Sequence, residues 1–152
     1  MIKRKLKPLE YAFGLLKLRD RSVGEVEERL RRKEYGEKEI AATMAFLVEK
    51  DFLDDERFAR NFVRFKKSLK PVGKYYLRNK LRQKKIDNEI IEKILGENSD
   101  ESEEVQEAAD RWLARNKKVP KEKIYEKLFR HLVSRGFEWE KAREVVEEKL
   151  KK

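Results

Sequence analysis

One spacing constrains the fold of this chain more than any other feature of its sequence. Apolar residues recur at a constant interval of 51 positions in four separate columns: Val26, Leu77 and Leu128; Leu30, Leu81 and Leu132; Tyr35, Ile86 and Phe137; Tyr11, Phe62 and Leu113. Self-similarity at a fixed period is typical of repeat architectures, in which each repeat packs against its neighbours. The columns therefore predict core positions of three equivalent repeats, and they need no functional explanation.

Each repeat is predicted to contain three helices. Apolar residues follow helical spacing in most segments, and only three prolines and six glycines interrupt the chain. We predict an all-α fold, a tandem array of three three-helix repeats that forms an elongated curved rod. The boundaries are 1–53 for the first repeat, 54–96 for the second, 97–104 for an acidic linker or helix start, and 105–152 for the third. A charged fraction of 46% against a hydrophobic fraction of 39% suits thin repeats with much surface.

Local signals place the ends of several helices. Ser22 and Glu25 have the spacing of an N-terminal capping box. Gly36 is predicted to end the second helix as its left-handed cap, and Pro71 to be the first residue of a later helix. The first helix is predicted over about residues 8–18, with one face that comprises Tyr11, Ala12, Leu15 and Leu18.

We find no motif for catalysis, a cofactor or a metal, and we predict that the protein is not an enzyme. His131 is the only histidine, and we interpret it as ordinary helix structure and not as a catalytic base. Asp54 and Asp55 are interpreted as helix caps because no histidine or calcium-loop spacing accompanies them. The helix that they begin is predicted to bury Phe58, Phe62, Phe65 and Leu69.

Positive charge is concentrated in the middle of the chain, from Arg64 to Lys85. This window holds ten Lys or Arg residues and no Asp or Glu, in a chain of net charge +10. Like charges at i and i+4, as at Lys74, Arg78 and Arg82, disfavour an isolated helix, so the stripe indicates an anionic partner that neutralises it. We predict a contact surface made of Lys66, Lys67, Lys70, Lys74, Arg78, Arg82, Lys84 and Lys85.

The charge pattern alone leaves the partner open. Phosphates of single- or double-stranded DNA, an acidic protein groove and a merely solvated lysine-rich face are all consistent with it. A membrane-surface helix is disfavoured because the apolar faces are already used by the core columns, and no apolar run approaches a membrane span. The absence of cysteine excludes disulfides. The N-terminus does not have the pattern of a signal peptide, so a cytoplasmic protein is expected.

Two stretches resemble signatures of the RecX family of recombinase regulators. FLDDERFA at residues 52–59 is similar to the family's aromatic-Leu-Asp-Asp segment and the Phe-Ala-containing helix that follows it. Leu81, Arg82, Gln83 and Lys84 are similar to the second signature. The resemblance covers roughly residues 10–150 and is weakest in the third repeat.

The resemblance implies a function as well as a fold. It implies a bacterial regulator that binds the RecA filament on DNA and mainly inhibits its assembly, ATP hydrolysis and strand exchange. The partners expected from it are the RecA filament and the DNA inside that filament, and we expect a monomer. A general DNA-binding helical repeat protein is the alternative that the charge stripe supports.

Overall fold

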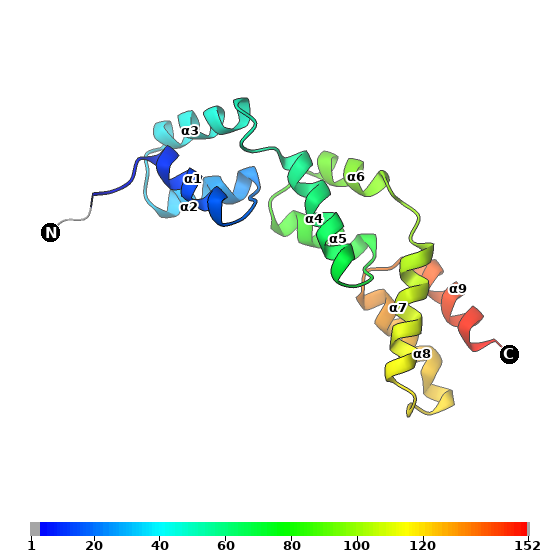
Figure 1. The fold of residues 1–152 in the computed structure, drawn as a ribbon. Coiled ribbons are helices and arrows are strands. Elements are labelled where there is room, and N and C mark those ends of the chain that lie inside the picture. The colour runs from blue at the N-terminus through cyan, green and yellow to red at the C-terminus, as the bar shows by residue number, and fades with distance from the viewer. Residues whose placement is uncertain (1–3, 152) are drawn as a thin grey trace. The chain divides into compact units, whose positions relative to one another are not determined.

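The computed structural model describes residues 4–151, and all regular structure in that range is helical (Figure 1). The predicted all-α fold is therefore confirmed. The helices of the described range are α1 (Pro8–Leu18), α2 (Val23–Arg32), α3 (Glu37–Glu49), α4 (Asp55–Leu69), α5 (Lys74–Gln83), α6 (Asn88–Gly96), α7 (Ser102–Arg115), α8 (Lys121–Ser134) and α9 (Trp139–Leu150).

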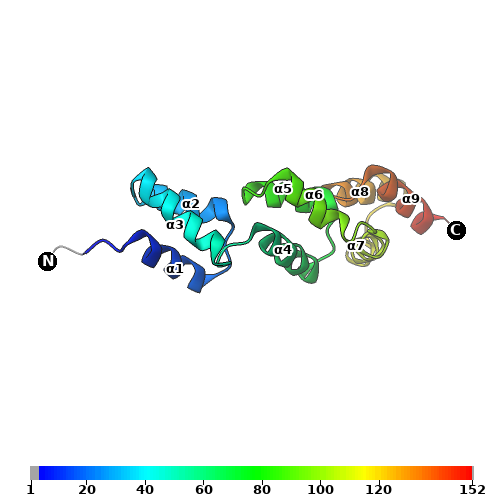
Figure 2. The ribbon, with the colours of Figure 1, turned by 90° about the horizontal axis from the view of Figure 1, so that it is seen from above.

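The chain divides into two compact units, and the first unit extends to Arg60 and also includes Leu81–Ile91. In it, α1, α2 and α3 pack against one another, as the view in Figure 2 shows. Each of these helices is amphipathic and turns its apolar stripe toward the other two. The shared core consists of Ala12, Val26, Leu30, Ile40, Met44, Leu47 and Leu53.

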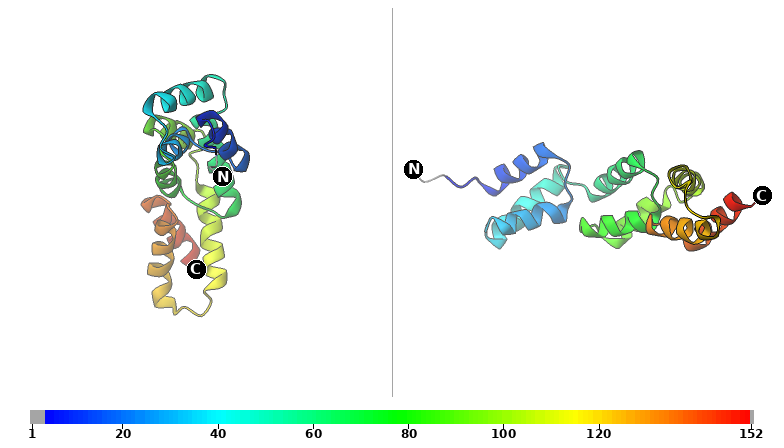
Figure 3. Two further views of the ribbon diagram at one scale, coloured as in Figure 1. Left: turned by 90° about the vertical axis from the view of Figure 1, so that its left-hand side faces the viewer. Right: turned by 90° about the horizontal axis from the view of Figure 1, so that it is seen from below.

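The second unit consists of Asn61–Lys80 and the chain from Glu92 onward. Here α7, α8 and α9 pack on one another, and Figure 3 shows α7 running alongside α8 with a loop joining them at one end. The core that they enclose consists of Val105, Ala108, Ala109, Trp112, Leu128, Leu132, Phe137, Ala142, Val145 and Val146.

The interval of 51 residues has a local structural cause at the C-termini of α2, α5 and α8. At each terminus one residue takes a left-handed conformation, at Glu34 (φ 62°), Lys85 (φ 62°) and Gly136 (φ 88°). The amide of the following residue then donates a hydrogen bond to a carbonyl five positions earlier, as Tyr35 does to Leu30 at 3.4 Å. This is the Schellman cap, in which the residues that make this bond also form an apolar contact. Two predicted columns are thus the two sides of one recurring cap.

Two predicted helix ends are wrong. Gly36 does not end α2, because it lies before α3 with φ −66° and the left-handed position belongs to Glu34. Pro71 does not begin a helix, because residues 71–73 lie outside the helices and α5 starts at Lys74. The Gly73 amide is instead used in a hydrogen bond to the Arg135 carbonyl at 2.8 Å.

Three apolar residues placed on core faces are exposed. Leu18 has 79% of its surface accessible, and Phe65 and Leu69 each have 58%. All three lie in the last five residues of their helices, α1 and α4. Phe58, near the start of α4, is buried as predicted.

Ser22 makes the most connected cap of the first unit. Its hydroxyl accepts from the Glu25 amide at 3.1 Å, and the Glu25 carboxylate accepts from the Ser22 amide at 3.1 Å, which confirms the predicted capping box. The same hydroxyl donates to the Lys84 carbonyl at 2.6 Å. In the second unit, Gly73 and Arg135 are joined by a backbone hydrogen bond, and each of them lies 51 positions after Ser22 or Lys84. The repeat therefore reproduces a long-range contact as well as a helix pattern.

Replacement of Ser22 by alanine is expected to lower the free energy of unfolding by about 1–2 kcal/mol, the usual cost of losing an N-cap. Urea unfolding followed by circular dichroism measures this loss. Ser134→Ala is the matched control, because the Ser134 hydroxyl is exposed and donates a local hydrogen bond to the His131 carbonyl three positions earlier. Equal losses in the two variants would contradict the role assigned to Ser22.

Candidate functional site

Five residues of the predicted basic surface lie in the second unit, and Arg78 is the most firmly held of them. Its guanidinium donates two hydrogen bonds to the Glu92 carboxylate, at 2.7 and 3.1 Å, and lies 5.2 Å from the centre of the Tyr75 ring. The Glu92 carboxylate raises the pKa of Arg78 above its ordinary value. The positive charge of Arg78, the middle residue of the predicted stripe, is therefore neutralised by the Glu92 carboxylate of the same chain.

The other four residues in this unit differ in their freedom to meet a partner. Lys67 is 3.6 Å from the Glu104 carboxylate, and Lys66 lies 5.4 Å from the centre of a phenylalanine ring in α4. Lys74 is partly buried, and its backbone amide donates to the Glu101 carboxylate. Lys70, in the connection between α4 and α5, is exposed.

Arg82, Lys84 and Lys85 belong to the first unit. Arg82 is exposed and donates to the Asn88 side-chain oxygen at 3.3 Å. Lys84 is 3.4 Å from Glu25, and Lys85 is 2.9 Å from Glu28. Lys84 and Lys85, like Lys67 and Arg78, are thus paired with carboxylates from outside the window.

A basic groove of about 350 Å³ surrounds these lysines in the first unit. Arg21 is buried in its wall, its Nε has no hydrogen-bond partner among the described residues, and burial lowers the pKa of Arg21. Burial alone would raise the pKa of Glu25, but the Arg19 guanidinium, the Ser22 amide and the Lys84 charge together lower it. The groove also contains side chains that the predicted surface did not include: Arg19, Arg21, Arg29 and Arg32.

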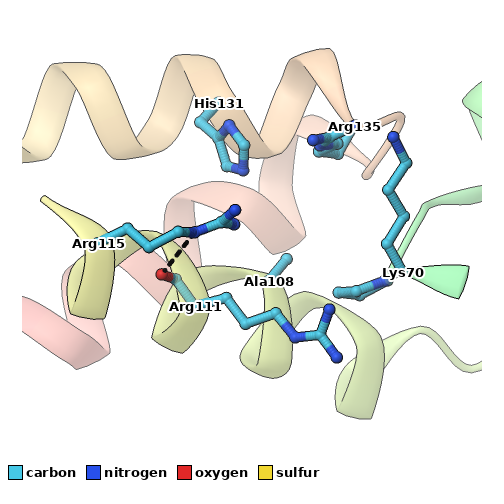
Figure 4. Close-up of a pocket in the computed structure, with 7 residues that line it drawn as sticks. Lys70, Ala108, Arg111, Arg115, His131 and Arg135 are labelled. Carbon is cyan, nitrogen blue, oxygen red and sulfur yellow. Dashed lines mark hydrogen bonds between the residues drawn. The ribbon is translucent and has the colours of Figure 1, made fainter.

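A second cationic cavity, of about 70 Å³, lies in the second unit (Figure 4). It is lined by Lys70, Pro71, Ala108, Arg111, Arg115, His131 and Arg135. Arg111 and Arg115 extend from α7, His131 extends from α8, and Arg135 is the C-cap residue that follows α8; the Arg115 side chain is directed toward His131. Only Lys70 of this set was predicted to belong to a binding surface. The sequence carries a signal for the other cations, namely Arg111 and Arg115 at i,i+4 on one helix and Arg135 four residues after His131.

The residues predicted to be structural have clear contacts. Asp54 accepts from the Arg57 amide at 3.1 Å, which confirms its capping role. Asp55 accepts from the Val23 amide at 2.8 Å, so it caps α2 as well as beginning its own helix. Burial raises the pKa of Asp55 in spite of this hydrogen bond. In the part of the chain that the structure describes, no three His, Cys, Asp or Glu residues are grouped to hold a metal.

The described helices are also too short or too polar to cross a membrane.

Two family models match this chain. One describes the first three-helix domain of RecX and covers residues 9–47, and the other describes the second three-helix domain and covers residues 54–95. The fold and these matches define an all-helical protein that contains helix-turn-helix-type three-helix domains.

Relatives with similarity along nearly the whole chain identify the family. The regulatory protein RecX of Prosthecochloris aestuarii is 36% identical over 95% of this chain and 94% of its own length. The regulatory protein RecX of Chlorobaculum tepidum is 33% identical over 94% of this chain and 88% of its own length. The crystal structure of RecX from Lactobacillus salivarius has the same fold, with a TM-score of 0.84 and 24% identity over 93% of this chain and 94% of that one. The chain belongs to the RecX family of regulatory proteins.

Proposed function

We propose that this protein binds the RecA filament on DNA and restrains its assembly, ATP hydrolysis and strand exchange. The observation that carries the proposal is the 36% identity to a regulatory protein RecX over 95% of the chain. The cation-lined surfaces of the two units support it, because a filament that contains DNA presents many phosphates. The protein acts by binding and not by catalysis, as a monomer in the cytoplasm where such filaments form.

The contact surface proposed for this function is the basic window. Its residues differ in whether their charge is already paired with a carboxylate of the chain. Arg82 and Lys74 are the most suitable for a test on α5, because the structure shows neither of their side chains in an ion pair with a described residue. Arg78 is unsuitable, because its replacement by Glu would set two carboxylates against each other at Glu92. Replacement of both Lys74 and Arg82 by glutamine removes two positive charges without creating a new repulsion.

The deciding measurement is the steady-state ATPase rate of the cognate RecA on single-stranded DNA. We expect the unmodified protein to lower this rate at less than one copy per RecA, and the double variant Lys74→Gln, Arg82→Gln to need a higher concentration for the same effect. The matched control is Lys38→Gln, Lys50→Gln, which removes the same charge at exposed positions of the first unit outside the window. An ATPase rate that does not change at equimolar protein would refute the proposal.

General DNA binding is the second candidate, and the charge of the window favours it. It predicts salt-dependent affinity for naked duplex DNA, with a slope of log affinity against log salt that becomes shallower by about 0.9 for each phosphate that a variant no longer neutralises. If the double variant loses DNA affinity and the ATPase effect in parallel, binding to DNA accounts for both. If only the ATPase effect disappears, the window contacts RecA.

A further inference from the structure

The cavity of the second unit holds an uncompensated concentration of positive charge. Of the described residues that line it, four are Lys or Arg, one is histidine and none is acidic. Arg111 has a carboxylate partner, Glu107 at 2.6 Å, but the structure shows no ion pair between Lys70, Arg115 or Arg135 and any residue of the described range. Three full charges thus line one small space without a counter-charge from residues 4–151.

Helix α7 carries two of the cations that line the cavity at an unfavourable spacing. Arg111 and Arg115 are four residues apart on α7, whereas His131 lies on α8 and Arg135 is the C-cap residue just after it. Like charges at this spacing, as at Arg111 and Arg115, destabilise a helix, and the Arg115 side chain is directed toward His131 (Figure 4). An anion between them would offset this repulsion, because each of these charges would then have an attractive partner.

The shape and chemistry of the cavity select a small anion. Its volume of about 70 Å³ has room for several water-sized groups, since one water needs about 10–15 Å³ of such space. The small side chain of Ala108 lines it, and Arg115 is oriented by a hydrogen bond from its Nε to the Arg111 carbonyl at 3.3 Å. The terminal nitrogens of Arg115 remain directed toward the His131 ring. Guanidinium groups held in this manner suit the oxygens of a phosphate.

We propose that this cavity is a discrete site for one phosphate group, held by Lys70, Arg115, Arg135 and His131. The ligand is a tetrahedral oxyanion, either free inorganic phosphate or one phosphodiester of a nucleic acid. The site is distinct from the α5 surface tested above, and its occupancy does not require a RecA filament. Failure of either proposal therefore leaves the other intact.

His131 supplies a direct readout because it is the only histidine in the chain. Burial and the charges of Arg135 and Arg115 lower the pKa of His131. Lys70 and Arg111 add positive charge from the connection after α4 and from α7, and Glu107 offsets Arg111. An oxyanion stabilises the imidazolium, so its binding raises the pKa of His131. The titration midpoint must therefore move to higher pH when the oxyanion binds.

The experiment follows the imidazole protons of His131 by NMR during a pH titration of the full chain. Sodium sulfate, which does not titrate near neutral pH, is compared with sodium chloride at equal ionic strength, and inorganic phosphate and a short thymidine oligonucleotide are tested in parallel. We expect sulfate and phosphate to move the midpoint to higher pH. In Arg115→Gln, Arg135→Gln we expect the apparent affinity for sulfate to fall at least about tenfold, as for the loss of a charge-assisted hydrogen bond.

Controls keep the result independent of folding. Lys70→Gln changes an exposed side chain outside the helices and must weaken sulfate binding even if the double arginine variant does not fold. Lys118→Gln changes an exposed residue outside the cavity and must leave the midpoint shift unchanged. Equal midpoints in sulfate and chloride, or a sulfate shift that survives in Lys70→Gln and in the folded arginine variant, would overturn the site. A shift with the oligonucleotide but not with sulfate would also overturn it, because a general polyanion field would then be sufficient.

Discussion

Replacement of Gly136 by alanine is expected to lower the free energy of unfolding of the second unit by about 2–5 kcal/mol. Gly136 has φ 88°, and a Cβ atom there would lie 2.3 Å from the Tyr76 amide nitrogen and 2.5 Å from the Tyr76 Cβ. A residue with a side chain pays about 1–2 kcal/mol for the left-handed conformation, and displacement of a packed backbone costs about 1–3 kcal/mol more. The segment around Tyr76 has no room to retreat, because the neighbouring Tyr75 amide is bonded to the Gly136 carbonyl at 3.0 Å.

The measurement is urea unfolding followed by tryptophan fluorescence. Both tryptophans, Trp112 and Trp139, lie in the second unit, so their emission reports that unit. Gly96→Ala is the matched control in the same unit: nothing lies within 4 Å of a Cβ at Gly96, the last residue of α6, so its free energy of unfolding is expected to change by less than about 0.5 kcal/mol. An unchanged unfolding midpoint for Gly136→Ala would contradict the close approach of Gly136 to Tyr76.

The second large effect is expected at Phe58, whose replacement by alanine should cost about 3–5 kcal/mol, as is usual for a buried aromatic side chain. Phe58 is 5% exposed near the start of α4. Phe65 lies seven residues later on the same helix and is 58% exposed, so Phe65→Ala should change the free energy of unfolding by less than about 0.5 kcal/mol. Urea unfolding followed by circular dichroism distinguishes the two, and similar losses in both variants would show that Phe65 is a core residue after all.

This pair also shows how far apolar spacing predicts a core. Phe58, Phe65 and Leu69 fit one helical face equally well, yet only Phe58 is buried. Spacing identifies the residues that share a face, but the length over which that face is covered depends on packing by segments elsewhere in the chain. The 51-residue columns were more informative, because Leu30, Leu81 and Leu132 must satisfy the same packing and the same cap at three places, and all three are fully buried.

Predicted helix ends failed where the backbone has a distant partner or an unusual conformation. Gly36 is the obvious residue for a left-handed position, but Glu34 occupies it. The cap there is stabilised by backbone hydrogen bonds and by the Leu30 and Tyr35 positions, so the identity of the left-handed residue is secondary. Pro71 suggested a helix start because local rules do not contain Arg135, whose carbonyl binds the Gly73 amide from 62 positions away.

The candidate site, like the helix ends, was only partly predictable from the sequence. A run of basic residues is visible in the sequence, and the window from Arg64 to Lys85 is recognisable from its charge alone. The carboxylates that neutralise Arg78, Lys84 and Lys85 come from outside the window, so their pairing was not predictable from it. The cavity around His131 combines residues from three separate segments, and its α7 and α8 residues do not belong to the basic window.

The long-range cap of α2 sets an order of events during synthesis of the chain. The Ser22 hydroxyl binds the carbonyl of Lys84, which lies 62 residues later in the chain. The Gly73 amide likewise binds the carbonyl of Arg135, again 62 residues later. At about 5–20 residues per second, a ribosome needs about 3–12 s to deliver each missing partner. The N-terminus of α2 therefore emerges without its partner carbonyl, and we expect nascent chains that stop before Lys84 to be more sensitive to proteolysis at α2 than chains that extend past it.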